Sequence, residues 1–125
     1  MATCSICHQA GGELGYAVGP DIESIAGQTR INLLTKIIKP NDFVTAGYDG
    51  YIVETTDGET LTGVMVQESS HSVTLRAPGG VEHTVQRDNL QMARPLGYSV
   101  MPEGLESTMS VQDMADLFEF IKNLE

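Results

Sequence analysis

The apolar positions in the first part of the chain repeat at helical spacing. Residues 21–26 are typical of a short helical turn. A longer amphipathic helix is predicted to begin at Arg30 and to end before Pro40, because proline stops a helix. Four aliphatic residues mark its apolar side: Ile31, Leu34, Ile37 and Ile38. The pattern therefore predicts helices up to Pro40.

From Tyr48 onward, apolar and polar residues alternate, which is typical of strands with one buried face. The alternating segments are 51–55, 61–67, 73–75 and 81–86. Asp57-Gly58 is a hairpin turn signal, and the run 77–80 is a second turn. Four or five short antiparallel strands are predicted up to Pro95, forming a small twisted sheet or half-barrel.

The last segment predicts an amphipathic helix that begins after Ser110. Ser110 and Asp113 have the spacing of a capping box, in which each side chain accepts a hydrogen bond from the other residue's backbone. The apolar stripe of this helix consists of Val111, Met114, Leu117, Phe118, Ile121 and Leu124. Such a stripe has to be covered, and only three residues precede Cys4 to supply a packing helix. We therefore expect a second subunit, a cofactor edge or a helix ahead of this sequence to cover it, and a homodimer is one such arrangement.

Composition and charge restrict the partners. The chain has 125 residues, enough for one compact domain with an inserted module. Its 17 acidic and 7 basic residues give a net charge of −10, which repels nucleic acids and anionic membranes. The acidic residues are spread along the chain, which indicates a solvated surface, and a docking face for a basic redox partner is the alternative. No segment approaches the roughly 20 apolar residues of a membrane span, so we expect no membrane insertion. Because the chain has no tryptophan, a buried cofactor would help to fill its interior.

The strongest chemical signal is Cys4-Ser5-Ile6-Cys7-His8, whose Cys-x-x-Cys-His spacing is typical of covalent haem attachment. Two thiols one helical turn apart can each form a thioether with a haem vinyl group, which leaves the adjacent imidazole next to the iron. One haem c, bound through Cys4 and Cys7 with His8 as an iron ligand, is therefore the predicted cofactor.

Three other interpretations of the two cysteines are weaker. A thioredoxin-like pair would follow a strand of a βαβ unit, and three residues are too few for one. A zinc site would need His71 and His83 as further ligands, and both lie in segments that alternate like exposed strands. A disulfide between Cys4 and Cys7 would close a very short loop and would leave His8 unexplained.

Two further residues are candidates for contacts around the haem. The turn at Gly19-Pro20 can bring the Pro20 carbonyl to His8, because a ligating histidine usually donates its other ring N–H to an acceptor. A plain surface turn is the alternative. Arg30 is either a solvated cation or a partner for a haem propionate.

A methionine thioether is the expected sixth ligand of the iron. Of the six methionines, Met101 and Met109 are the candidates, and Met101 is favoured because Pro102 and Gly104 interrupt regular structure and can hold it on a loop. Three others are expected to fill the core or the surface: Met65, Met92 and Met114.

Six stretches of the sequence together carry a resemblance to a known family: Cys4 to His8, Gly19-Pro20-Asp21-Ile22, Gly47-Tyr48, Asp57 to Gly63, Val73-Thr74-Leu75 and Met101 to Leu105. They resemble the haem-binding domain family of planctomycete and verrucomicrobial bacteria, and the similarity covers nearly the whole chain. The resemblance implies an α+β fold in which residues 1–47 and 98–125 form a cytochrome c-like helical haem domain. Residues 48–97 are then an antiparallel β module inserted before the methionine loop. The resemblance also implies His8 and Met101 as axial ligands.

The expected function is one-electron transfer by a monohaem c-type cytochrome with a redox partner protein, because a His/Met-ligated iron needs no open coordination position. The alternative is a sensor or binding domain for CO or NO, in which Met101 leaves the iron. No residue near Met101 in the sequence offers acid–base chemistry, so no enzymatic activity is expected. Covalent haem attachment takes place outside the cytoplasm. We therefore expect a periplasmic or otherwise extracytoplasmic location, with Met1 either added for expression or marking the edge of an excised domain.

Overall fold

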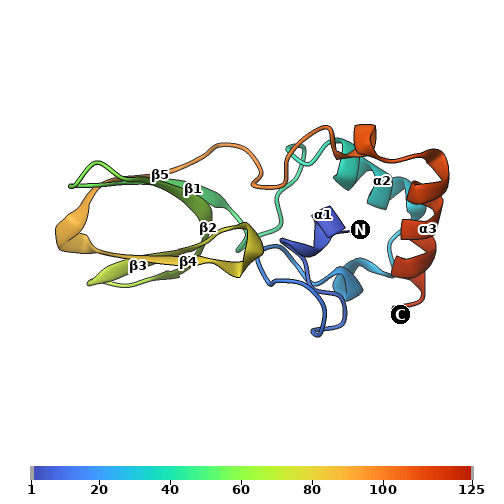
Figure 1. The fold of residues 1–125 in the computed structure, drawn as a ribbon, viewed down its shortest axis with the longest axis horizontal. Coiled ribbons are helices and arrows are strands. Elements are labelled where there is room, and N and C mark those ends of the chain that lie inside the picture. Colours follow the sequence, from blue (N-terminus) through green and yellow to red (C-terminus); the bar gives the residue numbers. More distant parts are fainter. Residues whose placement is uncertain (1, 125) are drawn as a thin grey trace.

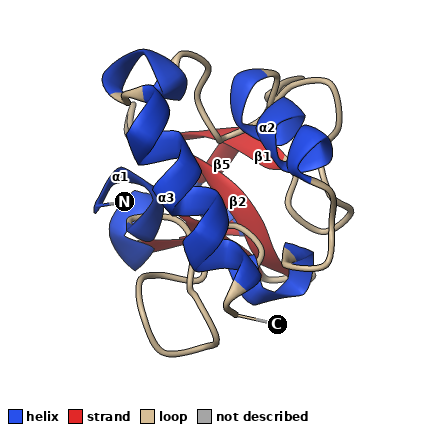
Figure 2. Ribbon diagram, turned by 90° about the vertical axis from the view of Figure 1, so that its right-hand side faces the viewer, coloured by secondary structure: helices blue, strands red, loops and turns tan. Residues whose placement is uncertain are grey.

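The structure is a computed structural model that describes residues 2–124. A β-sheet forms one end of the molecule and the helices α2 and α3 form the other, with α1 between them (Figure 1). Viewed along the long axis from the helical end, α2 and α3 both lie in front of the strands (Figure 2). The helices are α1 (Ala2–Ser5), α2 (Arg30–Ile38) and α3 (Val111–Lys122), and the 3-10 turns are η1 (Ile22–Ile25), η2 (Pro78–Gly80), η3 (Arg87–Asn89) and η4 (Leu105–Thr108).

The middle of the chain forms one five-stranded antiparallel sheet with the strand order β4-β3-β2-β1-β5. Its strands are β1 (Gly50–Thr55), β2 (Thr60–Glu68), β3 (Ser72–Arg76), β4 (Glu82–Gln86) and β5 (Leu90–Pro95). The sheet curls, so that β1 and β5 lie across from β3 and β4 (Figure 1). Four alternating side chains fill the space inside: Val53, Val73, Leu75 and Val85. The predicted antiparallel strands are confirmed, because period-two alternation gives each strand one buried face.

Helix α2 begins at Arg30 as predicted, with the Thr29 hydroxyl accepting a hydrogen bond from the Asn32 N–H at 3.2 Å. Its predicted apolar side is only partly right. Leu33 is the buried residue, whereas Ile31 is 77% exposed. Two positions along a helix correspond to a rotation of about 200°, so Ile31 and Leu33 lie on opposite sides. The face that packs inward is built from Leu33, Leu34 and Ile37.

Helix α3 has the predicted capping box. The Asp113 N–H donates to the Ser110 hydroxyl at 3.0 Å, and the Ser110 N–H donates to the Asp113 carboxylate at 2.9 Å. These bonds, led by the backbone one, lower the pKa of Asp113. The predicted stripe is wrong at Val111, which is 90% exposed because it lies in the first turn, beyond the packed part of the helix.

The apolar face of α3 finds its packing partners within the chain. Its buried residues Leu117, Phe118 and Ile121 form one core with three residues of η1, the following turn and α2: Ile22, Ala26 and Leu33. The Lys122 ammonium also donates to the carbonyl oxygens of Ala26 and Gln28, at 3.1 and 2.6 Å. The stripe therefore gives no reason for a second subunit.

The observed class is α+β, with the sheet inserted between two helical segments. The sheet occupies residues 50–95, within the predicted module at 48–97. None of the helices between residues 2 and 124 has the length and apolar character required to cross a bilayer.

Candidate functional site

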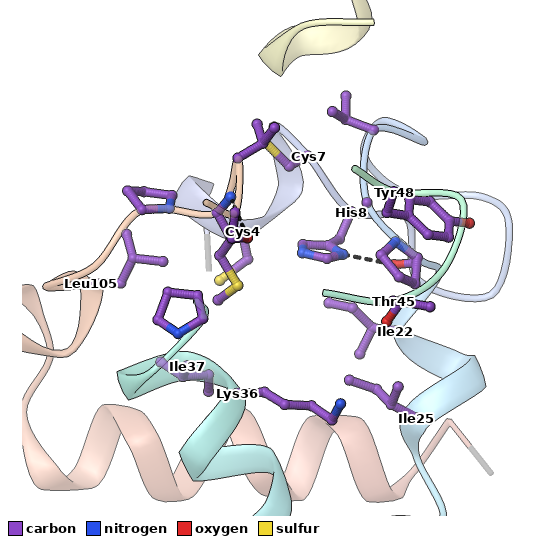
Figure 3. A pocket seen from close by; sticks show the side chains of 18 of the residues that line it. Cys4, Cys7, His8, Ile22, Ile25, Lys36, Ile37, Thr45, Tyr48 and Leu105 are labelled. Carbon is purple, nitrogen blue, oxygen red and sulfur yellow. Dashed lines mark hydrogen bonds between the residues drawn. The ribbon is translucent and has the colours of Figure 1, made fainter. Parts of the chain in front are cut away.

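A mainly apolar cavity of about 310 Å³ lies among the helical segments (Figure 3). Its walls come from parts of the chain that are far apart in sequence: the first eight residues, η1, α2, the loops after α2 and before η4, and α3. The two predicted attachment cysteines and both predicted axial ligands are among its lining residues, together with Pro20. The fold therefore gathers Cys4, Cys7, His8, Pro20 and Met101 around one space.

Cys4, Cys7 and His8 lie on a single helical turn. The Cys4 carbonyl accepts hydrogen bonds from the N–H groups of Cys7 and His8, at 3.1 and 2.9 Å. Both cysteines are free and half-buried. Burial raises the pKa of the Cys7 thiol, and the neighbouring Cys4 adds to the rise.

The predicted contact between His8 and the Pro20 carbonyl is present, at 2.7 Å from Nδ1 (the dashed line in Figure 3). A carbonyl oxygen can only accept, so Nδ1 carries the hydrogen and the lone pair of neutral imidazole is on Nε2. Gly19 makes this approach feasible, since a Cβ atom there would lie 2.5 Å from Cε1 of the ring. The ring is therefore held with one nitrogen engaged and the other free to bind a metal.

Asp21 closes the loop that carries the Pro20 carbonyl, which we call the attachment loop (residues 9–21). Its carboxylate accepts hydrogen bonds from the N–H groups of Gly11, Gly12 and Glu23, at 2.9, 2.6 and 2.9 Å. Gly11 and Gly12 have φ angles of 69° and 78°, which glycine adopts without strain. Desolvation acts to raise the pKa of Asp21, but the three backbone hydrogen bonds outweigh it and lower that pKa.

Met101 is half-buried and is the methionine, among residues 2–124, that lines the cavity. Its backbone N–H donates to the Ser99 hydroxyl at 3.1 Å. Met109, the other candidate, packs instead against the core of α3. Three others lie in regular elements, as their sequence patterns predicted: Met65 in β2, Met92 in β5 and Met114 in α3.

The structure does not bring Arg30 to the cavity. Its guanidinium is 62% exposed and lies 3.9 Å from the Glu119 carboxylate. The cation that does line the cavity, among residues 2–124, is Lys36 (Figure 3). Its ammonium lies 5.1 Å from the centre of the Phe43 ring. Sequence reasoning missed Lys36, because the side of α2 that faces the cavity depends on where α3 packs.

The β module forms part of the cavity wall through Val64 and Pro78. It is also tied to the attachment motif and loop by hydrogen bonds. The Gly79 N–H donates to the Ile6 carbonyl at 2.6 Å, and the Arg76 guanidinium donates to the Ala17 carbonyl at 2.7 Å. The end of β3 and the turn after it therefore contact the attachment motif and loop directly.

The two remaining histidines differ from their prediction as exposed strand residues. His71 is exposed but lies in the turn between β2 and β3, and His83 lies in β4 but is half-buried. Because β2 and β3 pair as a hairpin, position 71 lies in the turn that connects them. In such a turn, an alternation of polar and apolar residues does not indicate a strand. Within residues 2–124, no group of three or more His, Cys, Asp and Glu side chains is placed to hold a metal ion.

No protein-family model and no curated protein matches this chain.

Proposed function

We propose that this chain is a monohaem c-type cytochrome domain that transfers one electron. In this proposal the helical part is cytochrome c-like, and the chain belongs with the planctomycete and verrucomicrobial haem-binding domains that its motifs resemble. The observation that carries the proposal is the meeting of Cys4, Cys7, His8 and Met101 around one apolar cavity. These residues come from opposite ends of the chain, and the spacing of one motif does not require them to meet.

The residues present fit a covalently bound haem. The cavity volume of about 310 Å³ falls within the range of about 300–1,000 Å³ for small-molecule sites. Cys4 and Cys7 are free thiols that would form the thioethers, and His8 Nε2 and the Met101 sulfur would be the axial ligands. Lys36 would be the cation for a haem propionate, in place of Arg30.

The bound haem would supply a reversible one-electron couple between ferrous and ferric iron. The protein's own part is to hold its ligands. The Pro20 carbonyl keeps the His8 ring in one tautomer and one orientation. Apolar side chains of η1, α2 and α3 exclude water from the space beside the ligands, among them Ile22, Leu33 and Leu117. Such an arrangement favours the same six-coordinate iron in both oxidation states, as electron transfer requires.

The net charge of −10 supports a basic redox partner. An extracytoplasmic location remains part of the proposal, because the attachment of haem to cysteines takes place there.

The test is the absorption spectrum of the reduced protein with and without CO, after expression with a haem-attachment system in a bacterial periplasm. We expect a low-spin spectrum that CO does not change. Met101→Ala should leave the sixth coordination position of the iron without a protein ligand, so that CO binds and shifts the spectrum at once. The control Met109→Ala should behave as the wild type. If the wild type binds CO readily, the sensing function is favoured instead. If no haem becomes attached, or if Met101→Ala leaves the spectrum unaltered, the proposed ligand set is wrong.

A further inference from the structure

The loop that carries Met101 has little regular structure of its own. This methionine loop comprises residues 97–104 and is bounded by Gly97 and Gly104, which have φ angles of 81° and 87°. Between residues 97 and 103, no backbone-to-backbone hydrogen bond joins the loop to another described residue. The position of the loop must therefore depend on side chains.

One side chain, that of Asn41, bridges both arms of the methionine loop. Asn41 follows the end of α2, and its Oδ1 accepts a hydrogen bond from the Ser99 N–H at 2.7 Å. Its Nδ2 donates to the Glu103 carboxylate at 2.6 Å. The amide orientation is unambiguous, because Ser99 offers a donor and Glu103 an acceptor. The two bonds thus hold the chain on either side of Met101.

A third hydrogen bond connects Ser99, one end of this bridge, to the backbone of Met101. The Ser99 hydroxyl accepts a bond from the Met101 N–H at 3.1 Å. The bridge starts three residues after the end of α2, whose Lys36 and Ile37 line the same cavity as Met101. Asn41 therefore links a cavity-forming helix to the backbone of the proposed sixth ligand.

We infer that Asn41 is a positioning residue that determines how firmly Met101 stays on the haem iron. The inference rests on the proposed function. In it, the hydrogen bonds of Asn41 keep the iron six-coordinate, as electron transfer requires, and their loss lets the iron bind a gas. CO binds only where the methionine has left, so its apparent affinity follows the population of the methionine-off state. Loss of the bridge frees the loop and raises that population.

The experiment measures the apparent affinity of the reduced, haem-loaded full chain for CO. Asn41→Ala removes both hydrogen bonds of the bridge and should raise the CO affinity about tenfold, because each net hydrogen bond changes an equilibrium by a few-fold. Glu103→Ala removes one bond at an exposed position and should raise it about threefold. The matched control is Asn32→Ala, an exposed asparagine on α2, which should leave the CO affinity unchanged.

A rescue variant separates positioning from a general loss of stability. Asn41→Asp alone places a carboxylate against Glu103 and should release the loop. Combined with Glu103→Gln, it restores a donor–acceptor pair with reversed direction, while the new carboxylate still accepts from Ser99. The double variant should therefore return to within about twofold of the wild-type CO affinity. Urea unfolding of each variant, followed by far-ultraviolet circular dichroism, checks that the fold is kept.

The outcomes distinguish the inference from the proposed function. If Met101→Ala does not increase CO binding, Met101 is not the sixth ligand and the proposed ligand set fails. If Met101→Ala increases CO binding but Asn41→Ala and Glu103→Ala match the control, the positioning role is overturned and the ligand set stands. Should Asn41→Ala not fold, Glu103→Ala and the double variant still decide the matter.

Discussion

Substitution of Gly19 by alanine tests the close approach that holds His8. The φ angle of Gly19 is one that alanine adopts freely, so the effect is steric. The new Cβ would lie 2.5 Å from Cε1 and 2.9 Å from Nδ1 of the imidazole. Carbon atoms prefer separations of about 3.5–4.0 Å, so the ring must retreat by about 1 Å. A movement of that size along the bond takes the 2.7 Å contact with Pro20 beyond hydrogen-bonding distance.

The loss of folding stability comes from the steric contact and from the broken hydrogen bond. Overpacking costs about 1–3 kcal/mol, and loss of the hydrogen bond costs about 0.5–1.5 kcal/mol. Lower entropy of the unfolded chain with alanine offsets about 0.4–1 kcal/mol. We therefore expect Gly19→Ala to lower the free energy of unfolding by about 0.5–4 kcal/mol. Urea unfolding of the haem-loaded protein measures this change, and the haem spectrum reports whether the iron ligands have moved.

Gly50→Ala is the matched control, because Gly50 also has an ordinary φ angle. Its new Cβ would lie 2.7 Å from Leu96 Cδ1 and from Val100 Cγ2, which are methyl groups that no hydrogen bond holds in place. Its effect on stability should be clearly smaller. If the two variants are equally stable and the Gly19→Ala spectrum matches the wild type, the imidazole does not pack against residue 19 and the reasoning fails.

Three further predictions concern the surroundings of the cavity. Asp21→Ala should lower the free energy of unfolding by about 0.5–2 kcal/mol at neutral pH, and this difference should shrink as the pH falls below about 4. The reason is that the folded-state pKa of Asp21 is lowered, so its stabilisation is present above the ordinary pKa and is lost as the pH falls through the folded one. Arg76→Ala should speed proteolysis within the attachment loop, since it removes the bond to Ala17. Lys36→Gln should lower the haem reduction potential by about 20–70 mV, because a nearby cation favours the reduced iron.

Two of these predictions have a matched control variant. Arg87, in η3, pairs with Glu68 at the end of β2 and has no bond to the attachment loop, so Arg87→Ala should leave proteolysis of that loop unchanged. Lys39 is exposed beyond the end of α2, so Lys39→Gln should change the potential less than Lys36→Gln. Equal effects within either pair would contradict the contacts described here. A stability difference for Asp21→Ala that persists unchanged at low pH would contradict the role of its carboxylate.

The features that depend on neighbours in sequence are determined by the sequence alone. The attachment turn at residues 4–8 and the Ser110 capping box join residues at most four apart, so the spacing of residue types predicts both. The hairpin strands are predictable for the same reason, because the alternation of polar and apolar residues and the turn residues are signals within a few positions of one another. The contact between His8 and Pro20 could also be predicted, since a turn that contains Pro20 follows the motif closely in the sequence.

Contacts between distant segments were decided only by the tertiary structure. Which side of α2 is buried depends on where α3 packs, and so Leu33 rather than Ile31 faces the core. The same packing brings Lys36 instead of Arg30 to the cavity. The bridge from Asn41 to the methionine loop spans about sixty residues, and no local pattern of residue types encodes such a pair. Local spacing specifies the chemical groups, whereas the burial of apolar faces against one another specifies which of those groups meet.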